Sequence, residues 1–235
     1  MNTFGSAVRL AAPSTAGGWF WHAILAAQLM GPMGLLQPRL GAVQTPEQNP
    51  VDFFVNLGIS AACLIATVLR PHPHFRALAA ATWPLFLVAA FALASAVWSP
   101  FPDVTARRGL RLGLALFVSL VAVSRICDQR QVLGVAFGVC LASLAMNGLA
   151  LALGVAGPPG LLHGIFSHKN SLGAVAALSV LLTLSAAFAF RSSRLRFIAL
   201  LAAASWAALL VLSGSKTSTT VCAALVLCWF VLGIV

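Results

Sequence analysis

The densest group of polar side chains lies between Ser167 and Ser171, where five polar residues stand in a row before an apolar run. The glycines and prolines of Gly157 to Gly160 keep the preceding connection non-helical, so a helix begins at this group. A helix N-terminus offers free N–H donors and the positive end of its dipole, and Lys169 adds a full charge. The pattern predicts an anion-binding site; the alternative is that the Ser and Asn side chains only cap the helix. The candidate ligands are His168, Lys169 and Asn170.

A second polar stretch, Ser213 to Thr220, surrounds Lys216 with hydroxyl side chains between two further apolar runs. Small hydroxyl residues commonly form turns and cap helices. The same residues could join Lys216 in contacting an anion, and the sequence leaves both interpretations open.

Three arginines, Arg107, Arg108 and Arg111, form the third candidate group. Arg108 and Arg111 are three residues apart and share one face of a helix. Arg111 lies inside an apolar run, where an unpaired cation is costly. Guanidinium groups suit an anionic head group such as a lipid pyrophosphate. The alternative is that these side chains snorkel to the head-group region and bind nothing specific.

The composition indicates that these residues are positioned by membrane-spanning segments. Of the 235 residues, 60% are hydrophobic and 8% charged, and none is tyrosine. The mean hydropathy is +0.99. A soluble domain carries roughly 25% charged residues. The composition therefore excludes an ordinary soluble domain, a disordered chain and a soluble nucleic-acid module, and we expect no nucleic-acid partner despite the net charge of +10.

Apolar runs of about 17–25 residues, the length needed to cross a bilayer as a helix, follow one another almost without pause. They predict an all-α fold: a polytopic transmembrane helix bundle with seven full spans and a truncated eighth, forming one transmembrane domain over residues 1–235. Asn147 falls within a predicted span and is interpreted as an interhelical hydrogen-bond partner. The predicted runs are Gly18 to Leu36, Phe53 to Leu69, Leu78 to Val97, Gly109 to Ser124, Val132 to Val155, Ser171 to Phe190, Phe197 to Leu212 and Thr219 to Val235.

The distribution of basic residues predicts a cytoplasmic N-terminus, because loops on the cytoplasmic side carry an excess of Lys and Arg. The predicted cytoplasmic set is Arg9, Arg70, Arg76, Arg125, Arg130, Arg191, Arg194 and Arg196. The predicted outer set is Arg39, Arg107, Arg108, Arg111, Lys169 and Lys216. The three candidate groups described above therefore share the predicted outer side.

The acidic residues Glu47, Asp52, Asp103 and Asp128 all fall in predicted loops or at helix ends. Proton-coupled transporters usually need ionisable groups within their spans, and hydrolases that use paired carboxylates need two acids together. Neither pattern occurs. The pair His163 and His168 has no third ligand nearby, so we expect no metal site and no cofactor.

Several strings resemble the bacterial O-antigen ligase and polymerase superfamily, most closely its exopolysaccharide polymerase branch of the ExoQ type. They are His163-Gly-Ile-Phe-Ser-His-Lys-Asn-Ser-Leu-Gly173, the basic loop Arg191 to Arg196, Ser213-Gly-Ser-Lys-Thr-Ser218, and Trp98-Ser-Pro-Phe-Pro-Asp-Val-Thr-Ala-Arg107. The resemblance covers roughly residues 78 to 220.

The resemblance implies a glycosyltransferase of the bacterial inner membrane that polymerises or ligates polyprenyl-pyrophosphate-linked glycans at the periplasmic face. It implies no nucleotide sugar and no obligatory metal; other polysaccharide assembly proteins are candidate partners. Lys169, Asn170 and Lys216 match basic and Asn positions of the family motifs, whereas His163 replaces an arginine found in many relatives. The large periplasmic loop of the family, with its proposed catalytic histidine, would follow Val235, so we expect this chain to correspond to the N-terminal part and to be inactive if it ends here.

The resemblance suggests a mechanism in which the five cations hold the donor pyrophosphate and stabilise the charge that builds on it while an acceptor hydroxyl attacks the anomeric carbon. These cations are Arg107, Arg108, Arg111, Lys169 and Lys216. The catalytic base is not identified. The alternative function is a polyprenyl-glycan flippase or other transporter, or a non-catalytic membrane subunit.

Overall fold

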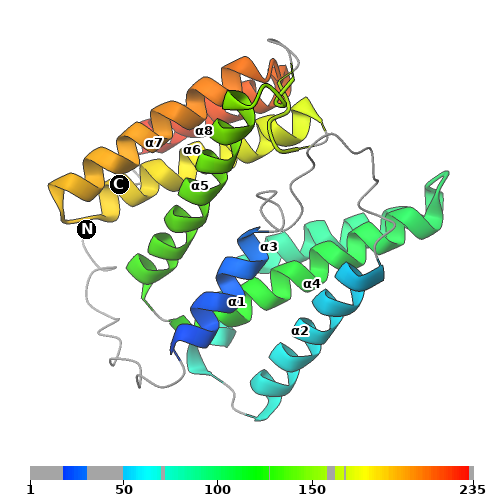
Figure 1. Ribbon diagram of the computed structural model, residues 1–235. Coiled ribbons are helices and arrows are strands. Elements are labelled where there is room, and N and C mark those ends of the chain that lie inside the picture. Colours follow the sequence, from blue (N-terminus) through cyan, green and yellow to red (C-terminus); the bar gives the residue numbers. More distant parts are fainter. Residues whose placement is uncertain are drawn as a thin grey trace. The chain divides into compact units, whose positions relative to one another are not determined.

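The computed structural model describes residues 18–30, 50–69, 72–126, 128–157, 162–166 and 168–232, and all regular structure in these ranges is helical (Figure 1). The helices are α1 (Gly18–Met30), α2 (Pro50–Leu69), α3 (Pro73–Ala94), the short 3₁₀ helix η2 (Ser95–Trp98), α4 (Pro102–Ile126), α5 (Gln129–Ala152), α6 (Lys169–Ala189), α7 (Ser193–Leu212) and α8 (Lys216–Leu232).

Each of the eight predicted apolar runs has a helix at its place. Within the described residues, five helices are long and apolar enough to cross a membrane. They are α3 together with η2, counted as one, and α4, α5, α6 and α7. The apolar parts of α2 and α8, Leu57–Leu69 and Lys216–Val231, are shorter. The described part of the chain is therefore all-helical, as predicted, and its five long apolar helices support a multi-pass membrane protein. The count of seven spans and a truncated eighth stays a prediction, since parts of the first and last runs lie outside the described residues.

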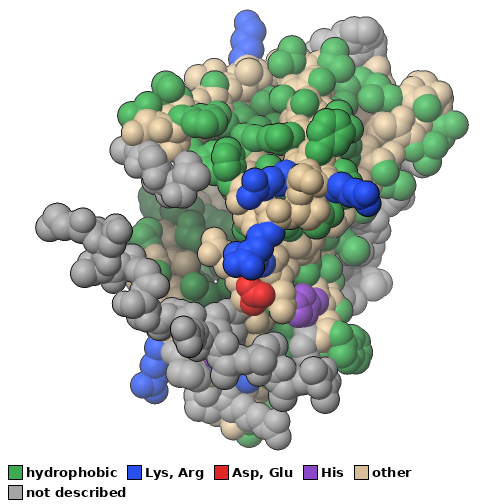
Figure 2. Space-filling model, turned by 90° about the vertical axis from the view of Figure 1, so that its left-hand side faces the viewer, with side chains coloured by type: hydrophobic (Ala, Val, Ile, Leu, Met, Phe, Trp, Pro, Cys, Tyr) green, Lys and Arg blue, Asp and Glu red, His purple; other side chains and the backbone are tan. Residues whose placement is uncertain are grey.

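The surface agrees with a lipid environment. On α3, Trp83, Leu87, Val88 and Phe91 are each more than half exposed. Hydrophobic side chains cover large areas of the face in Figure 2, and acidic side chains are scarce on it. Large apolar side chains at such density are typical of a surface that faces acyl chains rather than water.

The chain divides into two compact units, the first holding α1 through Gln28, α2, α3 and α4, and the second holding α5 from Arg130, α6, α7 and α8. In unit 1, α3 and α4 form an antiparallel hairpin (Figure 1). Gly109 lets the two backbones meet, because a Cβ atom there would lie 2.7 Å from the Cα atom of Leu93. At the tip, the hydroxyl groups of Ser99 and Thr105 are hydrogen-bonded at 2.6 Å.

The structure begins α4 at Pro102, seven residues before the predicted Gly109. Proline is favoured in the first turn of a helix because its missing N–H is not needed there, and Asp103 suits the positive end of the helix dipole. Arg107 and Arg108 are consequently helical residues and not part of a loop.

The other end of α4 is tied to α1 and α2. Arg125 donates from its guanidinium group to the carbonyl oxygen of Ala66 at 2.8 Å, and it lies 5.4 Å from the ring centroid of Trp21. Cys63, Val118 and Val121 form the buried apolar cluster beneath these contacts. The arginine thus joins three helices at this end of unit 1.

His72 stands beside Arg125, directly before α3, with its ring centroid 5.2 Å from that of His74. Burial, and then the charges of Arg125 and His74, hold the pKa of His72 below its ordinary value of 6.5. The folded chain therefore binds this proton less readily than the unfolded chain. The contribution of neutral His72 to the free energy of unfolding is fully present above about pH 6.5, the ordinary pKa of the group. It is lost as the pH falls from there toward the lower pKa that His72 has in the folded chain.

We expect the melting temperature of the purified protein in detergent to fall between pH 7.5 and pH 5, and the fall to be smaller in the variant His72→Gln. The comparison of the two proteins isolates His72 from the other histidines. An equal fall in both proteins would assign the pH dependence to another group.

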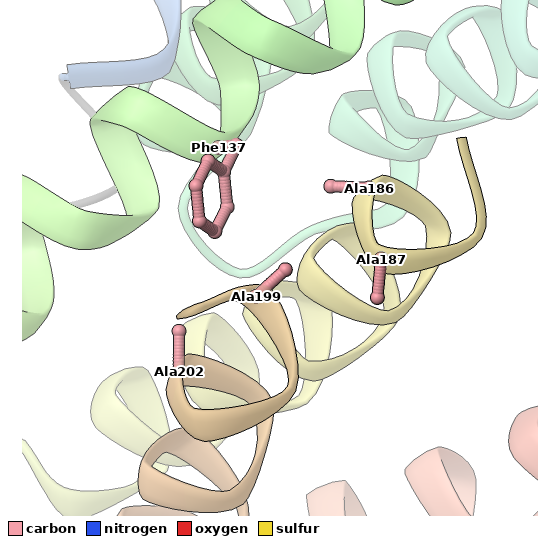
Figure 3. Close-up of a cluster of buried hydrophobic side chains, with 5 residues drawn as sticks. All are labelled: Phe137, Ala186, Ala187, Ala199 and Ala202. Atoms are coloured by element: carbon pink, nitrogen blue, oxygen red, sulfur yellow. The ribbon is translucent and has the colours of Figure 1, made fainter. Parts of the chain in front are cut away.

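In unit 2, α6 packs against both α7 and α8 (Figure 1). Figure 3 shows Phe137 of α5 facing alanines of α6 and α7, and all five side chains of this cluster are buried. Small side chains let membrane helices approach closely, which increases their van der Waals contact. The alanines are Ala186, Ala187, Ala199 and Ala202.

Candidate functional site

The connection into α6 is held by a buried asparagine of α5. Asn147 is fully buried; its amide oxygen accepts a hydrogen bond from the backbone N–H of Ile165 at 3.1 Å, and its amide nitrogen donates to the carbonyl oxygen of Ser143 at 2.8 Å. The sequence predicts an interhelical partner for Asn147, whereas its hydrogen bonds join it to the connection before α6 and to its own helix. Its neighbours Leu162, Ile165 and Phe166 are also buried. The segment before α6 is therefore packed into unit 2.

Gly164 makes this packing possible. Its φ of 59° is one that side chains with a Cβ rarely adopt, and a Cβ atom there would overlap the amide oxygen of Asn147. The His163 ring nitrogen Nδ1 lies 3.1 Å from the carbonyl oxygen of Gly164. Gly164 and Asn147 thus fix the backbone that leads to His168.

His168 is the N-cap of α6, and its Nδ1 accepts a hydrogen bond from the backbone N–H of Asn170 at 3.1 Å. The alternative that this polar stretch caps the helix is thus supported, but the cap is a histidine side chain and not Asn170 or Ser171, and Ser167 lies outside the described residues. The histidine side chain can reach the free N–H because the backbone at His168 is extended, with φ −150° and ψ 142°. Lys169, the first residue of α6, is partly exposed, and Asn170 is exposed.

The second polar stretch forms the tight connection between α7 and α8. Gly214 has a φ of 65°, and Ser213 uses its hydroxyl group to donate to the carbonyl oxygen of Leu210 at 2.7 Å. Ser215 donates from its hydroxyl group to that of Ser218 at 3.0 Å. The turn expected from these residues is present. Lys216 is exposed and begins α8.

Gly173 brings the two polar stretches together. An added Cβ atom on Gly173 would lie 2.5 Å from the Cβ atom and 2.8 Å from the hydroxyl oxygen of Ser215, so α6 touches the turn before α8 with no space between. Lys169 lies one helical turn before Gly173, and Lys216 follows Ser215 directly. The N-termini of α6 and α8 and both lysines therefore stand at the same end of unit 2.

The electrostatics of this end favour an anion. Two positive helix-dipole ends lie at this end of unit 2, each helix begins with a lysine, and the sequence contains no Asp or Glu from Arg130 to Val235. At the start of α6 the N–H groups of Asn170, Ser171 and Leu172 already donate to His168, so an anion would rely there on Lys169 and find backbone N–H donors and hydroxyl groups mainly at the start of α8. We call Lys169, Asn170, Lys216 and the adjoining helix starts the two-lysine end.

The arginine group lies elsewhere, on the first turns of α4 in unit 1. Arg107 and Arg108 are exposed and Arg111 is partly buried; the three flank Gly109 where α4 meets α3. Lys169 and Lys216 begin two helices that meet at one end of unit 2, whereas the arginines belong to unit 1. A joint site of all five cations stays a prediction.

Three residues that build the site were not singled out from the sequence: Gly164, Gly173 and Ser215. Each acts through a contact between segments far apart in the chain, and no local pattern marks such a contact. Among the described residues, no group of three or more His, Cys, Asp or Glu could hold a metal ion. Comparisons of the chain with protein-family models, with curated proteins and with solved structures find no match.

Proposed function

We propose that this chain is a membrane protein that binds the pyrophosphate group of a polyprenyl-linked glycan at the two-lysine end. The observation that supports the proposal is the contact of Gly173 with Ser215, which brings the starts of α6 and α8, each beginning with a lysine, to one end of unit 2. Pyrophosphate is an anion that needs several donors at once, and this arrangement supplies them. The five apolar helices support a ligand that is itself held in lipid.

The proposed activity is that of the O-antigen ligase and polymerase superfamily: transfer of the glycan from its pyrophosphate carrier to an acceptor hydroxyl at the periplasmic face of the inner membrane. The hydroxyl oxygen forms a bond to the anomeric carbon as the bond to the pyrophosphate oxygen breaks; the polyprenyl pyrophosphate leaves, and the hydroxyl proton passes to solvent at the membrane face. The lysines would stabilise the charge that remains on the pyrophosphate. This assignment rests on the resemblance of Gly164 to Gly173 and of Ser213 to Ser218 to the family strings.

Binding is tested with farnesyl pyrophosphate, a short soluble polyprenyl pyrophosphate, titrated onto the purified chain in detergent. We expect the variant Lys169→Gln/Lys216→Gln to bind at least about tenfold more weakly, because each lost charged donor removes a charge-assisted hydrogen bond. The matched control is Arg76→Gln/Arg130→Gln, which removes two exposed charges outside the two-lysine end. Farnesol, which lacks the pyrophosphate, should bind equally to all three proteins.

If both double variants bind farnesyl pyrophosphate equally weakly, the loss of affinity follows from net charge alone. That result would contradict a site at the two-lysine end. A second assay adds a polyprenyl-pyrophosphate-linked oligosaccharide and measures glycan length on a gel. Lengthening that depends on Lys169 and Lys216 supports the transferase. Binding without lengthening favours the transporter or non-catalytic subunit instead.

A further inference from the structure

The connection between α6 and α7 concentrates positive charge at the opposite end of unit 2. Arg191, Arg194 and Arg196 lie within six residues, and every residue from 191 to 198 is exposed. Arg196 donates from Nε to the carbonyl oxygen of Phe190 at 2.6 Å. This bond folds the connection back on the end of α6 and fixes the start of α7, which carries Arg194.

The charge of this connection has no counterpart in its own unit. From Arg130 to Val235 the sequence contains six basic residues, three of them in this connection, and no acid. No carboxylate of unit 2 can therefore neutralise Arg191 or Arg194. Neighbouring like charges repel one another, so an anion from outside the chain would be favoured here.

The surroundings of the arginines place them at the boundary between lipid and water. Leu195, Phe197 and Ile198 on the first turns of α7 are 43%, 68% and 42% exposed, so apolar surface begins where the charge ends. Phe188 of α6 packs edge-on against Trp229 of α8, with ring centroids 5.2 Å apart. Aromatic side chains are enriched at the level of lipid head groups.

We propose that Arg191 and Arg194, held in place by the Arg196 contact, bind the phosphate of an anionic phospholipid whose acyl chains lie along the apolar start of α7. The planar guanidinium group donates two parallel hydrogen bonds to a phosphate, a geometry that lysine cannot reproduce. The buried alanines and Phe137 beneath the connection give it a packed base (Figure 3). This inference concerns the end of unit 2 away from the two-lysine end and does not depend on the proposed function.

The experiment uses the full chain in detergent, titrated with phosphatidylglycerol or with zwitterionic phosphatidylcholine of the same acyl chains, and counts bound lipids by native mass spectrometry. We expect a preference for phosphatidylglycerol. Each arginine near a membrane surface contributes enough attraction to change affinity about fivefold, so Arg191→Gln/Arg194→Gln should bind phosphatidylglycerol about thirtyfold more weakly.

Two matched variants locate the effect. Arg76→Gln/Arg130→Gln removes the same net charge outside both proposed sites and should keep the preference for phosphatidylglycerol. Arg191→Lys/Arg194→Lys keeps the charge and should bind between the wild-type protein and the glutamine variant. Equal affinity of the wild-type chain for the two lipids would overturn the proposal, as would equal weakening by both charge-removing variants. Unchanged melting temperatures show that each variant is folded.

Discussion

The variant Gly164→Ala should unfold at a markedly lower temperature than the wild-type protein, with a loss of stability of about 2–4 kcal/mol. Two costs add. The new side chain must adopt a φ of 59°, and its Cβ atom overlaps the amide oxygen of Asn147. Relief of that overlap breaks the hydrogen bond from Ile165 N–H to Asn147 and leaves two buried polar groups unpaired. Thermal unfolding in detergent measures the loss.

Gly154→Ala is the matched control for this prediction. Gly154 has a similar φ of 70°, but a Cβ atom there would meet no other atom within 4 Å. Its substitution carries the backbone cost alone, about 1 kcal/mol. If both variants lose the same stability, the contact between Gly164 and Asn147 does not hold the connection.

The variant Gly173→Ala should lose both stability and farnesyl pyrophosphate binding. Its methyl group would lie 2.5 Å from the Cβ atom of Ser215 and 3.1 Å from the hydroxyl oxygen of Ser218, so α6 must move away from the turn before α8. Overpacking of this kind costs about 1–3 kcal/mol. Moving α6 separates Lys169 from Lys216, which removes the shared site. Thermal unfolding and ligand titration measure the two effects.

A second substitution tests whether the close contact is the cause. Ser215→Gly removes the two nearest atoms, and glycine before a helix costs only a few tenths of a kcal/mol relative to serine. The double variant Gly173→Ala/Ser215→Gly should therefore recover most of the stability. Gly138→Ala on α5, where a Cβ atom would meet nothing within 4 Å, is the control for adding a methyl group to a helix of this unit. No recovery in the double variant would contradict the proposed contact.

Helix positions were predictable because their cause is local. A bilayer requires long apolar runs, and the runs around α3 to α7 appear in the sequence without interruption. The start of α4 could also have been predicted, because Pro102 followed by Asp103 is typical of the first turn of a helix. The prediction began this helix at Gly109 because the uninterrupted apolar run starts there.

The candidate site was predictable only in part. Successive loops of a multi-pass protein lie on alternate sides of the membrane, which placed Lys169 and Lys216 on the same predicted side. In the structure they begin two helices that meet at one end of unit 2. Their closeness depends on Gly173 meeting Ser215, which are 42 positions apart in the numbering, and no property of either residue alone indicates this contact. The capping role of His168 was missed for a different reason: histidine is not among the favoured capping residues, and only the extended backbone there makes it one.

The bond between Asn147 and Ile165 also bears on how the chain enters the membrane. The two residues are separated by 18 positions, and α5 ends at Ala152, so the whole of α5 has been synthesised before the partner of the asparagine is made. Until then the amide oxygen of Asn147 has to keep another hydrogen-bond partner, which the acyl region of a bilayer does not offer. We therefore expect α5 to stay at the insertion machinery until the connection has followed it, and α5 and α6 to pass into lipid together as a hairpin.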